Sequence, residues 1–229
     1  MKNTFKKAFI DTLPGLMGYL VLGFGFGIIM ESGGYGSLLA ISMSILIYAG
    51  SMQYAAVGLF ASGASLVTVA VTTFMVNVRH IFYGISLLSK YKKTGVSKPY
   101  LIFSLTDETY SLVCRDDLGI SDSERHMYSL FVSILNHSYW VVGTALGVLA
   151  GKLVRFNTEG IDFALTALFV TVFVEQWLTA KKYIPAVIGV VVTLVCLIVF
   201  GRDSFLIPSM LIIALLLCFY REREKEERV

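Results

Sequence analysis

Residues 65–88 form a long apolar run with a charged centre, and this combination restricts what the chain can fold into. The run is long enough to cross a bilayer as a helix, where about 20 apolar residues suffice. Asn77, Arg79 and His80 lie in its middle. An arginine at the centre of a membrane helix costs about 2.5–3.5 kcal/mol on insertion scales unless it faces protein or water. Arg79 therefore marks a functional site or, on the plainer interpretation, a structural contact with backbone carbonyls of neighbouring helices.

The composition of the whole chain extends this conclusion. Of the 229 residues, 56% are hydrophobic and 15% are charged, which is more apolar surface than a water-soluble core of this size can bury. The apolar runs lack the alternation that is typical of membrane β-strands. We therefore predict an all-α polytopic membrane protein, a single transmembrane domain over 1–229 with a charged cytoplasmic tail at 221–229. We expect about 7–8 hydrophobic helical segments, one or two of them re-entrant or broken.

The basic residues predict how the chain is oriented. The net charge of +3 is concentrated in short connections and at both ends, which indicates topology signals and no nucleic-acid partner. Lysines and arginines near both ends place both termini in the cytoplasm. The basic loop 91–99 belongs on the same side, although three full crossings before it would put it outside. One earlier segment is therefore expected to enter and leave on one side, and 65–88 is the candidate.

Small residues mark the first apolar segment, 14–30. Pro14 is expected near the first turn of this helix. Gly23 and Gly27 form a GxxxG pair, a spacing that lets two helix backbones approach closely in lipid. The alternative is a thin, breakable helix whose backbone lines a substrate path.

The chain also contains the pattern of an internal duplication, with halves 8–115 and 127–220. Three residues of the first half recur 120 positions later, namely Tyr19, Gly23 and Gly27 as Tyr139, Gly143 and Gly147. Chance matches among apolar helices are the alternative interpretation, and both remain open. A true repeat would place a substrate site at the junction of the halves, as in many secondary transporters.

Two further segments combine apolar length with polar groups. Gly50 and Ser51, with Gln53, give the run 37–60 a small, hydrogen-bonding stretch that is suited to a helix break or a neutral polar ligand. The apolar piece 100–114 contains Asp107 and Glu108 and is short for a full crossing, which favours a re-entrant or half helix.

Five stretches of this sequence resemble one known family. They are PGLMGYLVLGFGFG at 14–27, AGSMQYAA at 49–56, NVRHIFYGISL at 77–87, TDETYSL at 106–112 and IDFALTALFVTVFVEQW at 161–177. In this order they resemble the AzlC family, the large subunits of bacterial branched-chain amino acid exporters. The resemblance implies export of leucine, isoleucine and valine, and sometimes methionine, across the bacterial cytoplasmic (inner) membrane. It also implies a small membrane partner of the AzlD type.

An amino acid substrate needs a counter-charge for each pole and an apolar pocket away from lipid. Arg79 is the best carboxylate partner, because its planar fork bonds two oxygens at once. Asp107 or Glu108 is the candidate for the ammonium group, and broken helix ends at Gly50–Ser51 or Asn77 add backbone donors. The candidate apolar walls are Tyr54, Phe74, Met75 and Phe82. The competing interpretation pairs Arg79 permanently with Asp107 to hold two broken helices together.

Export against a gradient needs an energy source. The sequence contains no Walker-type GxxxxGK[ST], so proton-coupled antiport is the hypothesis, with His80, Asp107 and Glu108 as candidates for proton coupling and His137 as a fourth. A hydrogen-bonded helix contact is the alternative role for an intramembrane histidine. No cofactor and no metal site are expected.

Two other functions remain open at this stage. One is a passive channel or a non-transporting assembly subunit. The more remote one is an intramembrane hydrolase, in which Ser51 and either His80 or His137 would form a dyad. Nothing in the spacing of these residues orients such a pair, so a non-enzymatic protein is the prediction.

Overall fold

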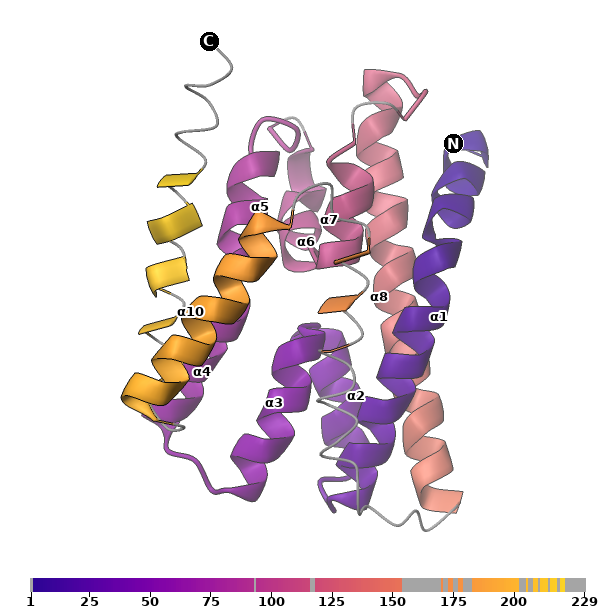
Figure 1. Cartoon of the computed structure of the whole chain (residues 1–229). Helices are drawn as coiled ribbons and strands as arrows, with labels where there is room; N and C mark the ends of the chain where they lie inside the picture. Colours follow the sequence, from indigo (N-terminus) through magenta and orange to yellow (C-terminus); the bar gives the residue numbers. More distant parts are fainter. Residues whose placement is uncertain are drawn as a thin grey trace. The chain divides into compact units, whose positions relative to one another are not determined.

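The computed structural model describes residues 2–92, 94–115, 118–153 and 183–201, with scattered positions between 170 and 220. Within these ranges the side chains of Phe82, Asp122 and Ser123 are not described. The chain divides into two compact units, 1–162 and 163–229. In the described part, every regular element is helical (Figure 1), as predicted. Much of the predicted second repeat half and all of the tail 221–229 lie outside the described residues, so the duplication stays a prediction.

Helix α1, Lys2–Ser32, is continuous through Pro14. The expectation that Pro14 lies in the first turn is therefore wrong, and no break occurs there. A proline inside a helix costs about 3 kcal/mol through its missing donor and a clash with the preceding turn. Contacts on both sides of Pro14 offset this cost. Before it, Tyr128 donates a hydrogen bond to Asp11 at 2.8 Å, and after it α1 packs closely on a second long helix.

That second helix is α8, Asp122–Leu153, which runs beside α1 in the same direction (Figure 1). Glycines form the seam between them, with Gly23 against Gly143 and Gly27 against Gly147. A Cβ atom on Gly23 would lie 2.7 Å from the carbonyl oxygen of Trp140, and one on Gly143 would lie 2.8 Å from that of Leu20. Only glycine permits backbones this close, and in lipid such packing is a main source of helix association. We call these four residues the glycine seam.

The predicted run 37–60 folds as a hairpin of two half-length helices, α2, Ser37–Leu46, and α3, Gly50–Ala61. The chain turns at Tyr48, whose φ of +46° lies in the left-handed region that only glycine adopts without strain. The two ends of the hairpin are close, because the rings of Tyr35 and Phe60 have centroids 5.4 Å apart. The hairpin therefore enters and leaves the unit on the same side.

The run 65–88 consists of α4, Leu66–Asn77, and α5, Arg79–Leu87, with a bend of 46° between them. The hydroxyl of Ser65 caps α4 by accepting from the backbone N–H of Thr68. In Figure 1, α4 begins at the end of the unit where α2 starts and α3 ends, and α5 continues from α4 toward the opposite end. The segment that enters and leaves on one side is thus 37–61, and the assignment of that role to 65–88 is corrected. Two crossings then bring the loop 91–99 back to the side of the N-terminus.

A second hairpin follows, after a 3₁₀ turn η1, Gly95–Ser97. Its arms are α6, Lys98–Phe103, and α7, Asp107–Val113, so the short apolar piece is a broken element as predicted. The side chain of Thr106 caps α7 by accepting from the N–H of Thr109. Lys90, just before the basic loop, donates to the carbonyl oxygen of Cys114, so the end of this hairpin lies on the side of that loop.

The two hairpins enter from opposite sides, and their tips meet. The ring of Tyr48 at the first tip lies 6.3 Å from that of Phe103 at the second. Tyr19 of α1 stacks on Tyr48 at 6.5 Å and hydrogen-bonds to Thr106. His137 of α8 lies 4.3 Å from Tyr48 and 5.9 Å from Phe103, measured between ring centroids. The middles of α1 and α8 thus hold both tips in contact.

Helix lengths fit a membrane. By length and composition α1 and the part of α8 from Glu124 to Leu153 are each able to cross a bilayer, as is the bent pair α4–α5 if it counts as one span. In the second unit, α10, Ile184–Phe200, is a shorter apolar helix that ends at Gly201, where φ is +72°.

Candidate functional site

Three broken helices begin around one arginine. Arg79 is the first residue of α5, and its Nη1 lies 2.6 Å from Oδ2 of Asp107, the first residue of α7. Its Nη2 donates a hydrogen bond of 3.1 Å to Oγ of Ser51, the second residue of α3. The guanidinium thereby joins the bend of α4–α5 to both hairpin tips. We call Arg79, Asp107 and Ser51 the arginine cluster.

Asp107 is held on both of its oxygens. While Oδ2 faces Arg79, Oδ1 accepts a hydrogen bond of 2.6 Å from the hydroxyl of Tyr83. Tyr83 lies one helical turn after Arg79, and its ring stacks on Tyr110 with centroids 4.6 Å apart. The side chains of Arg79 and Asp107 are 39% and 30% exposed, so the ion pair is only partly buried.

The cluster favours negative charge. Helix α3 has 12 residues and no side-chain cap at its start, so its free N–H groups add partial positive charge beside Arg79. The Nε of Arg79 is buried without a hydrogen-bond partner. Asp107 is the carboxylate that balances this charge in the structure. A carboxylate of a ligand is the kind of group that could replace it.

Glu108 lies next to the cluster in sequence but has different surroundings. Its Oε2 accepts a hydrogen bond of 2.9 Å from the hydroxyl of Tyr19. The ion pairs found among the described residues join Arg79 with Asp107 and Lys7 with Asp11, so Glu108 takes part in none of them. The side chain is exposed. The two adjacent carboxylates are therefore held by different helices, Asp107 by α5 and Glu108 by α1.

Several residues predicted for the site lie outside the cluster. Gln53 is fully buried and joins α8 to α2, because it accepts from Trp140 Nε1 at 3.0 Å and donates to Ser44 Oγ at 3.1 Å. Ser44 in turn is hydrogen-bonded to Thr144 at 2.8 Å. Gly50 backs onto the ring of Trp140. These contacts pack the first hairpin against α8.

The residues predicted as apolar walls of the substrate pocket also lie in different surroundings. The hydroxyl of Tyr54 donates to the carbonyl oxygen of Leu22, which fastens α3 to α1. Met75 is buried, whereas Phe74 is 60% exposed on α4. The side chain of Phe82 lies outside the described residues. Of the three described members of this group, Phe74 is the exposed one, and it lies within two turns of Arg79 in the sequence.

Neither histidine pairs with Ser51. His80 Nδ1 lies 3.0 Å from the backbone oxygen of Asn77, across the bend that joins α4 to α5. His137 lies between Tyr100, at 3.1 Å, and the carbonyl oxygen of Ser44, at 3.2 Å. The hydroxyl of Ser51 instead accepts from Arg79. The serine–histidine dyad needed by the hydrolase hypothesis is therefore not formed by these residues.

Sequence reasoning missed the two tyrosines that hold the carboxylates. Tyr83 could have been found from helical spacing, because residues four apart lie on one face and Arg79 is four positions earlier. Tyr19 gave a weaker signal, since it was noted only as part of the repeat. Its contact with Glu108 joins positions 89 residues apart, a pairing that no local pattern indicates.

Replacing Gln53 with leucine is expected to destabilise the protein by about 1–3 kcal/mol, because Trp140 and Ser44 would each lose a buried hydrogen-bond partner. The apparent melting temperature of the purified protein in detergent should fall by several degrees. Ser62→Ala is the control, since its exposed hydroxyl donates only to the carbonyl of Leu59, and it should leave the melting temperature unchanged. Equal melting temperatures for Gln53→Leu and wild type would contradict this role of Gln53.

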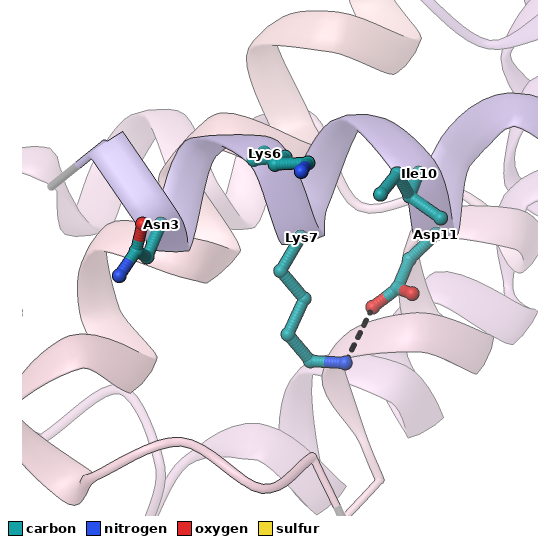
Figure 2. A pocket seen from close by; sticks show the side chains of 5 residues that line it. All are labelled: Asn3, Lys6, Lys7, Ile10 and Asp11. Carbon is teal, nitrogen blue, oxygen red and sulfur yellow. Dashed lines mark ion pairs between the residues drawn. The ribbon is translucent and has the colours of Figure 1, made fainter.

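A cavity of about 290 Å³ lies elsewhere, along the first three turns of α1. Its lining residues are Asn3, Lys6, Lys7, Ile10 and Asp11. Figure 2 shows the side chain of Lys7 reaching Asp11, with the nitrogen and oxygen 3.3 Å apart. This ion pair precedes Tyr19 by two turns, and it serves below as a control pair outside the arginine cluster.

Comparisons with known proteins agree on one family. Residues 14–154 match the family described as AzlC protein. The branched-chain amino acid transport protein AzlC of Bacillus subtilis is 42% identical over 97% of this chain and 88% of its own length. An uncharacterized membrane protein of Helicobacter pylori strain 26695 is 37% identical over 96% of both chains. The inner membrane protein YgaZ of Escherichia coli is 28% identical over 75% of this chain and 71% of its own length. No solved structure gives a significant match.

Proposed function

Because this membrane protein belongs to the AzlC family, we propose that it is a secondary transporter that exports branched-chain amino acids by proton-coupled antiport. The Bacillus subtilis relative, named for branched-chain amino acid transport, supports the substrate class. The observation on which the mechanism rests is the ion pair of Arg79 and Asp107 at the junction of two hairpin tips and a helix bend. An amino acid zwitterion carries a carboxylate that suits Arg79 and an ammonium group that suits Asp107.

Substrate binding replaces the internal ion pair with two external ones. The carboxylate of the amino acid binds the guanidinium of Arg79. The Ser51 hydroxyl and the free N–H groups at the start of α3 lie beside that guanidinium. The ammonium group binds Asp107. Tyr83 keeps this carboxylate oriented by donating a hydrogen bond to its Oδ1. Both charges thus keep a partner in the empty and the loaded state, so neither is left unpaired in a partly buried site.

The apolar side chain of the substrate distinguishes branched-chain amino acids from polar ones. Phe74, on the turn before Arg79, is an exposed aromatic residue suited to this contact. Phe103, which is 38% exposed at the second tip, adds further aromatic surface. Closing and opening of the hairpin tips on either side of the arginine cluster would give alternating access, as in transporters with broken helices.

The orientation and the partner belong to the same proposal. The N-terminus and the basic loop 91–99 lie at one end of the first unit (Figure 1), which supports a cytoplasmic position for both through their lysines. We place the protein in the bacterial cytoplasmic membrane with both termini inside. A small membrane subunit of the AzlD type is proposed as its partner on the family resemblance.

Leucine transport by the purified protein, reconstituted in proteoliposomes with and without the small subunit, tests this function. A tenfold excess of isoleucine or valine should reduce the flux of radiolabelled leucine severalfold, because both share its two charges and branched side chain. Analogues that lack the amino group (4-methylpentanoate) or the carboxyl group (isopentylamine) should reduce it by less than a third.

Uphill movement of leucine driven by an imposed pH gradient would exclude a passive channel. Equal competition by the analogues and by isoleucine would contradict zwitterion binding. Absence of leucine movement with the small subunit present would contradict the transporter proposal, and would favour an assembly subunit.

A further inference from the structure

We infer that the two adjacent carboxylates divide the work of antiport: Asp107 serves the substrate and Glu108, oriented by Tyr19, carries the proton. The inference rests on the proposed function and specifies its coupling residue. It starts from the contrast between two neighbours in sequence: among the described residues Asp107 forms an ion pair with a cation and Glu108 forms none.

Asp107 is poorly suited to release and take up protons during transport. Its Oδ2 is 2.6 Å from the guanidinium of Arg79, and its Oδ1 accepts from Tyr83. Both contacts stabilise the ionised carboxylate. A proton on Asp107 would leave Arg79 as an uncompensated charge next to the start of α3.

Glu108 has the opposite surroundings. In the described part of the chain, phenols from three elements interact with it: Tyr19 from α1, Tyr48 from the first tip and Tyr83 from α5. On its own helix the neighbour is Asp107, a like charge. From α8 the nearest polar contact with α7 is Asn136, which donates to Thr109. Glu108 takes part in no ion pair among the described residues, so its protonation breaks none, whereas protonation of Asp107 would break the pair with Arg79.

The histidines are less suited to this task than Glu108. His80 is hydrogen-bonded to the backbone oxygen of Asn77, and its ring lies edge-on to Tyr83 at 5.8 Å. His137 is enclosed by Tyr100, Tyr48 and Phe103 and is hydrogen-bonded on both nitrogens. Glu108 by contrast has one hydrogen bond to Tyr19 and an exposed side chain, so a proton reaches it without rearranging a packed helix contact.

Tyr19 is a positioning residue for Glu108. Its ring is fixed by Tyr48, with centroids 6.5 Å apart, and by Trp140 at 6.3 Å. A phenol hydroxyl donates to an ionised carboxylate and accepts from a protonated one, so Tyr19 holds Glu108 in both states. Because Tyr19 also hydrogen-bonds to Thr106 at the second tip, the protonation of Glu108 is joined to the contact between the two hairpins.

Two flux measurements in the same proteoliposomes test the assignment. The first is exchange of labelled for unlabelled leucine at equal pH, which needs no net proton movement. The second is uphill leucine accumulation driven by a pH gradient. In Glu108→Gln the ratio of driven accumulation to exchange should fall at least tenfold. In Asp107→Asn exchange itself should be lost, because the substrate loses the partner of its ammonium group.

Tyr19→Phe tests the positioning role through the pH dependence of driven transport, which loss of a purely structural contact would leave unchanged. Removing the donor favours the protonated form of Glu108, so the pH at which driven transport is half-maximal should rise by about half a unit or more. Tyr83→Phe, which removes the matching hydrogen bond from Asp107, should lower exchange without moving that pH. Should Glu108→Gln fail to assemble, Glu108→Asp and Tyr19→Phe still report through the pH profile.

The outcomes distinguish a failure of the proposed function from a failure of the assignment to Glu108. If the wild-type protein exchanges leucine but ignores the pH gradient, proton coupling fails as part of the proposed function. If the wild type responds to the gradient and Glu108→Gln responds equally, the assignment to Glu108 is wrong while the transporter stands. A pH profile of Tyr19→Phe that coincides with wild type would remove the positioning role.

Discussion

Arg79→Gln is expected to reduce leucine transport at least a hundredfold. The substitution removes the carboxylate partner of the substrate and leaves Asp107 without a cation. Hydrogen bonds to charged groups contribute about 1.5–3 kcal/mol each, and Arg79 makes two from one planar group. Arg79→Lys should retain part of the activity, because a lysine keeps the charge but cannot span Asp107 and Ser51 with a fixed fork. Initial rates of exchange in proteoliposomes measure both.

The matched control for Arg79→Gln is Lys7→Gln, which breaks an ion pair of 3.3 Å outside the arginine cluster. Surface pairs of this kind contribute about 0–1 kcal/mol, so transport should stay within twofold of wild type. The double variant Arg79→Gln with Asp107→Asn distinguishes substrate binding from a purely structural ion pair. It leaves no unpaired charge, so assembly should recover while transport stays absent. Recovery of transport in the double variant would show that the pair only holds the helices together.

Gly27→Val or Gly147→Val is expected to prevent stable assembly of the first unit. A Cβ atom on Gly27 would overlap the carbonyl oxygen of Thr144, and one on Gly147 would overlap that of Phe24. The obstacles are backbone atoms, which cannot rotate away as a flexible side chain can. Overpacking usually costs 1–3 kcal/mol, and separating two long helices along their seam should cost more than about 3 kcal/mol. The yield of monodisperse protein on size-exclusion chromatography should drop at least tenfold.

Gly18→Val is the control on the same helix, because a Cβ atom there meets no atom within 4 Å. It should give the yield and the apparent melting temperature of wild type. Normal yields for both seam variants would contradict the close packing of α1 and α8. Reduced yield for Gly18→Val as well would mean that valine harms α1 for reasons other than the seam.

The fold class and several breaks could be predicted from sequence, because they depend on local composition. Membrane-length apolar runs, the short piece 100–114 and the polar stretch at Gly50–Ser51 each gave a direct signal. The continuous course of α1 through Pro14 could not be predicted. Its cost is offset by contacts with α8 more than a hundred residues away. The polar centre of 65–88 predicts a re-entrant segment there, whereas the chain turns back at Tyr48, in a mostly apolar run.

For the candidate site, the chemical type of a residue was a better guide than its closeness in the sequence to other site residues. Residue types alone singled out Arg79, Asp107 and Ser51, which the structure brings together. Gln53 and Tyr54 were grouped with them because they are close in sequence. On a helix that begins at Gly50, however, these two side chains point toward α8 and α1. The partners of the carboxylates, Tyr83 and Tyr19, come from other helices, and only the three-dimensional packing reveals them.

The glycine seam has a consequence for biosynthesis. Gly143 lies 120 positions after Gly23, so α1 is synthesised long before the helix it packs against. At about 5–20 residues per second, translation leaves α1 waiting roughly 6–24 s for α8. Both hairpins, with their broken backbones, are made within that interval. Until α8 emerges, the two tips lack their contacts with His137, so the packing of the site is completed late in the synthesis of the chain.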